Sequence, residues 1–219
     1  MHVIRTLKFT LLALLLPATL LAQTSDDLVA TLQHDWAIAN YELTGDKQIK
    51  AYEALIEQAD AAVVNNPKSA EILVWNGIIK SAFAGVKGGV GALSYAKQAR
   101  HSLEASLEID DKVLNGSAYA SLGTLYFKVP GWPLGFGNDK KAVQLLQKAL
   151  EINPDGIDSN YFYADYLRDQ KDFKNAEKYL LKAQHAAPRA DRPVADLGRQ
   201  QEIQIALLEV REKLPHAGS

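Results

Sequence analysis

One pattern of small and large apolar residues occurs twice in this chain, at an interval of 34 residues. A fixed period of this length is typical of helical hairpins that stack side by side, since one hairpin cannot bury its apolar face alone. We therefore predict an all-α chain in which repeated pairs of helices form a solenoid. The two copies of the pattern are Ala142, Leu146, Ala149, Pro154 and Ala176, Leu180, Ala183, Pro188.

The residues from 118 to 188 resemble the tetratricopeptide repeat, a unit of two antiparallel helices named A and B. Leu122-Gly123 with Tyr126 matches helix A, and the repeated alanines and leucines match helix B. Two helices approach closely only where small residues face each other, which explains why glycine and alanine recur at these positions. The resemblance implies a tetratricopeptide-like solenoid of about four units that ends in a capping helix.

The same register divides the chain into four segments. Helical spacing of apolar residues predicts a first pair of helices, with Ser25 or Asp26 as the N-cap of the first. A helix without a partner near the C-terminus is expected to cover the last unit. The predicted segments are a signal peptide at 1–22, a degenerate first helical pair at 23–67, tetratricopeptide-like repeats at 68–188, and a capping helix with a tail at 189–219.

The first 22 residues have the composition of a secretory signal peptide. Arg5 and Lys8 flank an apolar run from 9 to 22, and we expect cleavage near Ala22. The alternative is a membrane anchor, but a run of about 14 apolar residues is shorter than the roughly 20 that span a bilayer. The chain has no cysteine, which excludes a lipid-modified cysteine, disulfides and thiolate metal sites. We expect a bacterial protein of the periplasm or the extracellular space, with no membrane span after cleavage.

Charge and residue pattern argue against several classes of function. The formal net charge is −2 and no basic stripe is present, so nucleic acid is not an expected partner. The histidines are scattered and no HExxH motif occurs, while Asp155 and Asp158 of the acidic cluster between 155 and 172 occupy a turn and a cap position. We find no preorganised set of catalytic or metal-ligating residues. The sequence therefore predicts no enzyme, no metal and no cofactor.

Two glycine-rich segments interrupt the repeats between helix A and helix B, at 84–92 and at 128–138. Equivalent turns of neighbouring units lie side by side on one edge of a stacked array. The first segment lacks the Gly-Lys-Ser or Gly-Lys-Thr of a phosphate-binding loop and has no strand before it. We therefore expect a flexible or ligand-covering turn at 84–92 and a second inserted turn at 128–138.

The resemblance also implies which helix A positions line the concave surface of the array. In the last unit these are Asp158, Tyr161, Asp165 and Arg168. The two preceding units would supply Ala120, Thr124 and Phe127, and then Glu71, Val74 and Ile78. The lysines and asparagines with which some tetratricopeptide proteins hold a peptide's C-terminal carboxylate are missing, so that binding mode is not expected. A binding groove and ordinary packing between repeats both fit these positions.

Four aromatic residues at the second insert are further candidates for binding a ligand or partner. Trp132 and Phe136 lie within the segment, and Tyr126 and Phe127 come directly before it. Large aromatic side chains on a loop either pack back onto the repeat core or line a pocket. Both alternatives fit the sequence.

The run Gly-Phe-Gly-Asn-Asp-Lys-Lys-Ala from 135 to 142 resembles the T-component family of tripartite periplasmic (TRAP-type) transporters. That resemblance implies a periplasmic helical-repeat protein that passes a hydrophobic ligand to a solute-binding partner. Our primary interpretation is a tetratricopeptide-type scaffold for protein–protein interaction, with a protein or peptide partner. The alternative is a carrier of a small hydrophobic ligand, associated with a TRAP-type transporter.

Overall fold

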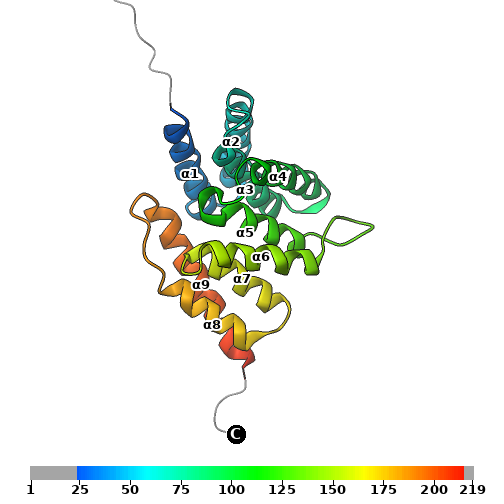
Figure 1. The fold of residues 1–219 in the computed structure, drawn as a ribbon, viewed down its shortest axis with the longest axis vertical. Helices are drawn as coiled ribbons and strands as arrows, with labels where there is room; N and C mark the ends of the chain where they lie inside the picture. The colour runs from blue at the N-terminus through cyan, green and yellow to red at the C-terminus, as the bar shows by residue number, and fades with distance from the viewer. Residues whose placement is uncertain (1–23, 215–219) are drawn as a thin grey trace, which may run out of the picture.

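The computed structural model describes residues 24–214, so the predicted signal peptide at 1–22 lies outside the described residues. Within the described range the chain folds into α-helices, and the all-α prediction is confirmed (Figure 1). The helices are α1 (Ser25–Tyr41), α2 (Gly45–Asn65), α3 (Ala70–Lys87), α4 (Gly89–Ile109), α5 (Val113–Lys128), α6 (Asp139–Ile152), α7 (Ile157–Asp169), α8 (Phe173–Gln184) and α9 (Pro193–Lys213).

Successive helices pack in pairs, α1 with α2, α3 with α4, α5 with α6, and α7 with α8. Each pair also contacts the next, so the pairs follow one another from the N-terminal to the C-terminal end of the molecule (Figure 1). Helix α9 follows the fourth pair and packs on α7 and α8. This arrangement confirms a solenoid of about four units with a C-terminal helix.

Helix α9 reaches further than the last unit, because it also contacts α1. Gly198 of α9 lies against the ring of Tyr41, whose hydroxyl donates a hydrogen bond of 3.3 Å to Glu202. Ala195, near the start of α9, belongs to the same buried cluster as Trp36 and the other apolar residues of α1. The C-terminal helix thus joins the last unit to the first.

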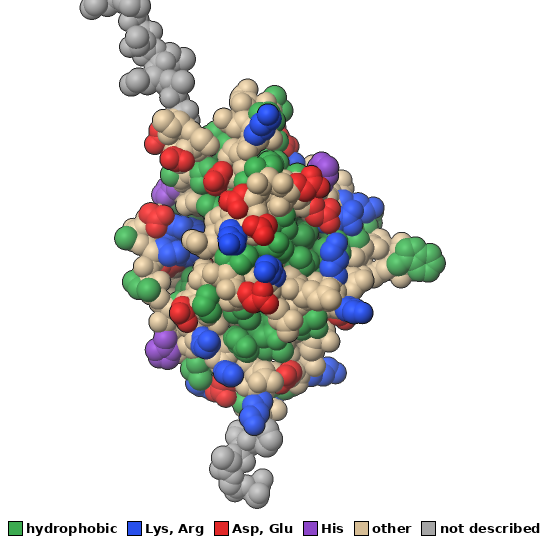
Figure 2. Space-filling model, in the orientation of Figure 1, with side chains coloured by type: hydrophobic (Ala, Val, Ile, Leu, Met, Phe, Trp, Pro, Cys, Tyr) green, Lys and Arg blue, Asp and Glu red, His purple; other side chains and the backbone are tan. Residues whose placement is uncertain are grey.

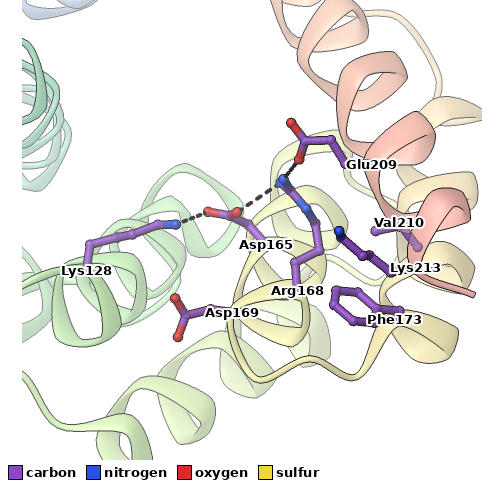
Figure 3. A pocket seen from close by; sticks show the side chains of 8 residues that line it. All are labelled: Lys128, Asp165, Arg168, Asp169, Phe173, Glu209, Val210 and Lys213. Atoms are coloured by element: carbon purple, nitrogen blue, oxygen red, sulfur yellow. Dashed lines mark hydrogen bonds and ion pairs between the residues drawn. The ribbon is translucent and has the colours of Figure 1, made fainter.

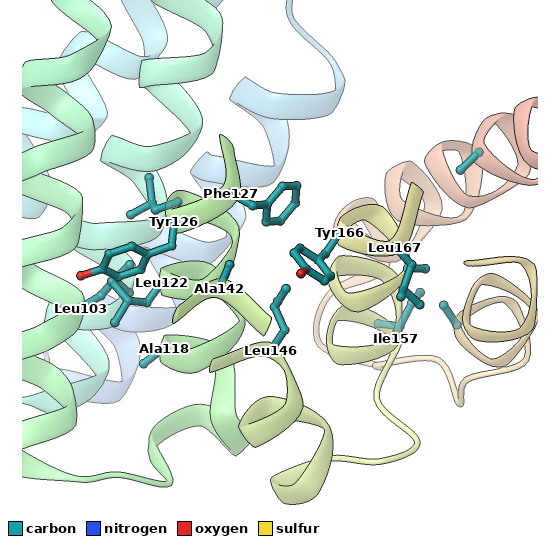
Figure 4. Close-up of a cluster of buried hydrophobic side chains, with 14 of the residues drawn as sticks. Leu103, Ala118, Leu122, Tyr126, Phe127, Ala142, Leu146, Ile157, Tyr166 and Leu167 are labelled. Carbon is teal, nitrogen blue, oxygen red and sulfur yellow. The ribbon is translucent and has the colours of Figure 1, made fainter. Parts of the chain in front are cut away.

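Small residues let the two helices of each repeat approach closely. A Cβ atom added at Gly123 would lie only 2.7 Å from Cγ of Leu146, and one added at Gly77 would lie 2.6 Å from Cγ of Leu103. Figure 4 shows Leu103 and Leu146 within the buried cluster that runs through the middle of the solenoid. These positions fit glycine because close packing leaves no space for a larger side chain.

Overpacking one of the repeated alanines is expected to destabilise the fold. Ala183 is fully buried, and leucine there must insert three more carbon atoms into filled space. We expect Ala183→Leu to lower the free energy of unfolding by about 1–2 kcal/mol, as overpacked cores usually do. Urea denaturation measures this loss, with Lys174→Ala in the same helix as the control. A leucine variant as stable as the wild type would contradict the repeat register.

The first predicted insert, at 84–92, is not a loop, and that prediction is wrong. Helix α3 continues to Lys87 and α4 begins at Gly89, so Gly88 alone separates them. Gly88 and Gly89 have φ angles of 60° and 62°, which glycine adopts without a steric penalty and which let the chain reverse at once. The additional residues therefore lengthen the two helices, to 18 and 21 residues, instead of forming a turn.

The second predicted insert is a loop. Helix α5 ends at Lys128 and α6 begins at Asp139, and the loop between them projects from the side of the solenoid (Figure 1). Asn138 closes the loop as the N-cap of α6, because its side chain accepts a hydrogen bond of 2.9 Å from the backbone N–H of Lys141. The loop thus has a fixed end where the next helix begins.

The N-cap of α1 differs from the prediction by one residue. Thr24 caps the helix, not Ser25 or Asp26, since its hydroxyl accepts a hydrogen bond of 3.1 Å from the backbone N–H of Asp27. The side chain of Asp27 in turn accepts from the backbone N–H of Thr24. This reciprocal capping box satisfies two backbone N–H groups at the start of the helix.

Candidate functional site

The eight residues proposed from the sequence do not converge on one site. They divide between the end of α5 with the loop that follows it, a cleft between α5, α7 and α9, and the side of α7 that the first turns of α9 cover. The three groups are Tyr126, Phe127, Trp132, Phe136; Asp165, Arg168; and Asp158, Tyr161.

Three of the four aromatic residues near the loop pack into the repeats. Tyr126 is buried and meets the half-buried ring of Phe136 edge-on, with 5.5 Å between the ring centroids. The guanidinium carbon of Arg100 lies 4.6 Å from the centroid of Phe136. Phe127 is buried as well and meets Tyr166 edge-on at 5.6 Å. These contacts join neighbouring helices and leave the three rings little surface for a partner.

Trp132 behaves differently, because it stands at the tip of the loop with 90% of its surface exposed. Leu134 beside it is 74% exposed. Figure 2 shows hydrophobic side chains gathered at the tip that projects from the molecule. Trp132 therefore does not pack onto the repeat core, and it lines neither the cleft nor the cavity described below.

The cleft between α5, α7 and α9 is held by a chain of ion pairs. Lys128 Nζ lies 2.9 Å from one oxygen of Asp165, and Arg168 Nη1 lies 3.2 Å from the other (Figure 3). Arg168 also pairs with Glu209 of α9. The cleft encloses about 260 Å³. The two acids and two bases of this chain of pairs neutralise one another, so its evident role is to attach α9 to the array.

Asp158 and Tyr161 lie beneath the first turns of α9. Asp158 accepts from Nε of the buried Arg199 at 3.0 Å and from Nη1 of Arg189 at 2.6 Å. Burial alone would raise the pKa of Asp158, but Arg199, Arg189 and Arg192 outweigh it and hold the pKa well below its usual range. Burial also raises the pKa of Tyr161 to about 12, and the Arg199 guanidinium lies 4.3 Å from its ring centroid.

A cavity of about 490 Å³ lies between α1, α3, α5, α7 and the segment that leads into α9. Its volume is in the range of pockets for small molecules, about 300–1,000 Å³. One part of its wall is apolar and partly aromatic, and another part carries charged and polar side chains. The apolar part consists of Trp36, Trp75, Ile78, Leu114 and Phe162, and the polar part includes Asp158, Ser159, Arg189, Arg192 and Arg199.

The backbone at one edge of the cavity is strained. Leu114 and Asn115 have φ angles of 47° and 53°, and Gly116 follows at 80°. For residues with a side chain this left-handed conformation costs roughly 1–2 kcal/mol each. The short left-handed turn separates the start of α5 from its regular part and places these three residues in the cavity wall.

Comparison with known proteins identifies the type of helical repeat. No protein-family model and no curated protein matches the sequence. The thermophilic TPR protein TTC0263 of Thermus thermophilus superposes with a TM-score of 0.59 and 17% identity, over 85% of this chain and 82% of that one. This chain has a tetratricopeptide-like repeat fold. Two MamA structures align with TM-scores of 0.45 and 0.44 at 16% identity, over 78% and 84% of this chain and 96% and 91% of theirs.

The surface that the A helices of the array form is not an open groove, because α9 covers part of it. Helix α9 lies across α7 and reaches α1, and its side chains pair with Asp158 and Arg168. Among residues 24–214 no cluster of three or more acidic or histidine side chains is placed to hold a metal ion. The cavity beneath the start of α9 and the tip of the 129–138 loop are therefore the candidate sites.

Of the positions that the resemblance placed on the concave surface, Ile78, Ala120 and Asp158 line the cavity, and most of this site was not predicted from the sequence. Trp36 and Trp75 stand at apolar positions of regular helices, where a tryptophan is usually a core residue. The signal available in the sequence is the group of three arginines between 189 and 199, which follows the last repeat. Their position over the aromatic wall depends on where α9 folds back.

Proposed function

We propose that this tetratricopeptide-like protein is a periplasmic or secreted scaffold that binds a protein or peptide partner through the tip of the 129–138 loop. The observation that carries the proposal is the exposure of Trp132, 90%, and Leu134, 74%, on a loop that projects from the array. A large aromatic side chain on the surface supplies contact area at a low cost in conformational entropy, and tryptophan is enriched among residues that dominate interface energies.

Backbone hydrogen bonds hold the 129–138 loop in a defined conformation without a partner. The backbone N–H of Gly137 donates to the carbonyl of Pro130 at 2.9 Å, and the N–H of Asn138 donates to the carbonyl of Tyr126 at 2.7 Å. Nearer the tip, the N–H groups of Leu134 and Gly135 both donate to one carbonyl at 3.1 Å. A preorganised loop lowers the ordering cost of association, which supports a role in recognition.

The predicted compartment and the architecture of the repeats agree with this proposal. The segment at 1–22 has the features of a signal peptide. No helix between residues 24 and 214 combines the length and the apolarity needed to cross a membrane. The scaffold function needs neither a catalytic group nor a cofactor, and we propose no enzymatic activity.

N-terminal sequencing of protein recovered from cells checks the predicted compartment, since the exported chain should begin near Gln23.

The proposal is tested by replacing Trp132 with alanine. A partner is first captured by a photo-crosslinking amino acid at position 134 in intact cells, and its affinity is then measured by calorimetry. We expect Trp132→Ala to weaken binding by about 2 kcal/mol, as aromatic anchors often do. The melting temperature should not change, because the side chain is exposed.

The matched control is Leu208→Ala, which removes another exposed apolar side chain on the outer face of α9, 65% exposed. It should bind the partner as tightly as the wild type. Equal affinity of the Trp132→Ala and wild-type proteins, or crosslinks at position 208 with the same partner and yield, would contradict a site at the loop tip.

A second function is favoured by the cavity beneath α9. A hollow of about 490 Å³ with an aromatic wall suits a small molecule better than a peptide. In this function the protein is a ligand carrier associated with a TRAP-type transporter, as its resemblance at 135–142 implies. Native mass spectrometry of the purified protein tests it, since a carrier is expected to retain a small molecule that denaturation releases.

A further inference from the structure

We infer that the cavity beneath α9 binds a small amphipathic organic anion, whose negative group is held at Arg192 and whose apolar part lies on the wall formed by Trp36 and Trp75. This inference rests on the carrier function proposed above and adds the chemical class of the ligand. It is independent of the loop tip at Trp132.

The cations of the cavity wall differ in whether the chain supplies their partners. Arg199 pairs with Asp158 at 3.0 Å and with Glu202 at 2.5 Å. Arg189 pairs with Asp158 as well, and its Nη2 lies 2.5 Å from Asp196. Each of these two guanidiniums therefore has two carboxylates. The protein satisfies their charge, and they hold the segment before α9 in place.

Arg192 forms no ion pair with any residue between 24 and 214, although it is half-buried and lines the same cavity. Its Nε atom is buried and has no hydrogen-bond acceptor among the described residues. Burial, and then the neighbouring Arg189, lower the pKa of Arg192, which means that its surroundings disfavour its positive charge. Buried charges are normally paired, so this guanidinium lacks the counter-ion that its position calls for.

The carboxylates near Arg192 do not fill that role. Asp158 is engaged by Arg189 and Arg199, and Asp196 is engaged by Arg189. Asp155 and Asp191 contribute to the cavity lining but are exposed, and neither pairs with Arg192. The charge that would complete the site therefore has to come from outside the described chain. A carboxylate suits it, because the planar guanidinium matches two oxygens at once.

The aromatic wall of the cavity indicates that the anion has an apolar, organic part. Trp36 and Trp75 meet edge-on with 5.7 Å between centroids, and the guanidinium carbon of Arg192 lies 5.1 Å from the centroid of Trp75. Both indole N–H groups are buried without an acceptor among residues 24–214, so this wall presents two unpaired hydrogen-bond donors. Ile78 and Phe162 extend the apolar surface. Such a surface next to an unpaired cation fits a ligand with an apolar body and one acidic end.

The strained turn at Leu114 supports a binding role for the same cavity. Three successive residues in the left-handed region are kept here, and two of them carry side chains. Strain of this kind concentrates at ligand-binding sites, where the rest of the fold holds it in place. Regular helix at 114–116 would remove the strain, and the turn instead contributes Leu114 and Asn115 to the cavity wall.

The ligand class is tested on the mature chain with acids and their neutral amides. The probes are decanoate with decanamide and 4-phenylbutyrate with its amide, and binding is followed by calorimetry and by thermal shift. We expect the acids to bind at least tenfold more tightly than the amides. Inorganic phosphate alone should not compete at equal concentration, because it offers nothing to the aromatic wall.

Substitutions then assign the charge to one residue. Arg192→Gln should weaken binding of the acids at least tenfold and leave binding of the amides unchanged. Arg192→Lys should restore part of the loss, since it keeps the positive charge. Arg211→Gln on the outer face of α9 is the matched control and should bind like the wild type, because Arg211 pairs with Glu177 away from the cavity.

Three outcomes would overturn the inference in distinguishable ways. Equal binding of acids and amides would leave the carrier function standing and remove the anionic class. Phosphate that competes as well as the acids would identify a site for inorganic anions. Failure of all four organic probes to bind at about 1 mM, the weak end of the range for specific ligands, together with no small molecule in the native mass spectrum, would remove the carrier function as well.

Discussion

Replacing Arg199 with methionine is expected to lower the free energy of unfolding by about 3 kcal/mol, the effect of removing one partner from a buried ion pair. Arg199 is 6% exposed, and its guanidinium forms ion pairs with both Asp158 and Glu202. It also stacks above the rings of Tyr161 and Phe162, at 4.3 and 4.6 Å from their centroids. Methionine keeps much of the apolar packing and none of the charge, so Asp158 is left with fewer partners.

The measurement is urea denaturation at neutral pH, with Arg211→Gln as the control. Arg211 also belongs to α9 and pairs with Glu177 at 2.7 Å, but its side chain is 53% exposed. An exposed pair contributes between about 0 and 1 kcal/mol, so the control should lose little. If the two variants lose the same stability, Arg199 does not anchor α9, and the cavity beneath this helix is less firmly closed than the structure indicates.

The repeats could be predicted from the sequence because packing at their positions is local. The contact of Gly123 with Leu146 is made inside one hairpin, and the same small and large residues recur in the next one. The sequence alone therefore shows which residues face each other. The register predicted from Ala142 and Ala183 places both residues in the buried core, as the structure shows.

The segment at 84–92 shows where the glycine pattern led to a wrong prediction. Its many glycines favour a loop, yet a single glycine between two helices suffices for the reversal when φ is positive. Gly85 and Gly91 are accepted inside helices at a cost of about 1 kcal/mol each relative to alanine. The length of the segment alone does not distinguish a long turn from two long helices.

The cavity could not be predicted, because it arises from the return of α9 to α1. Nothing in the helical spacing of residues 193–213 says which neighbour the helix meets. The return depends on the curvature of four stacked pairs, to which every interface contributes a little. Trp36 and Arg192 are 156 positions apart in the sequence and become parts of one wall only through this closure.

The closure itself leads to the second large effect, which is expected at Gly198. A Cβ atom at this position would overlap the ring of Tyr41, closer than any normal contact. Neither helix can yield easily, because Tyr41 is held by its hydrogen bond to Glu202 and Arg199 fixes the same stretch of α9. Alanine at 198 must push α9 away from α1, and we expect a loss of about 2–3 kcal/mol in the free energy of unfolding.

The matched control for Gly198→Ala is Gly85→Ala in α3, where an added Cβ meets no atom within 4 Å. Both substitutions place alanine in the interior of a helix, which by propensity alone stabilises a helix by up to about 1 kcal/mol relative to glycine. The two variants should therefore move the urea midpoint in opposite directions, upward at Gly85 and downward at Gly198. Stabilisation by both would show that α9 does not press against α1, and this contact would then not be what holds Arg199 in the cavity wall.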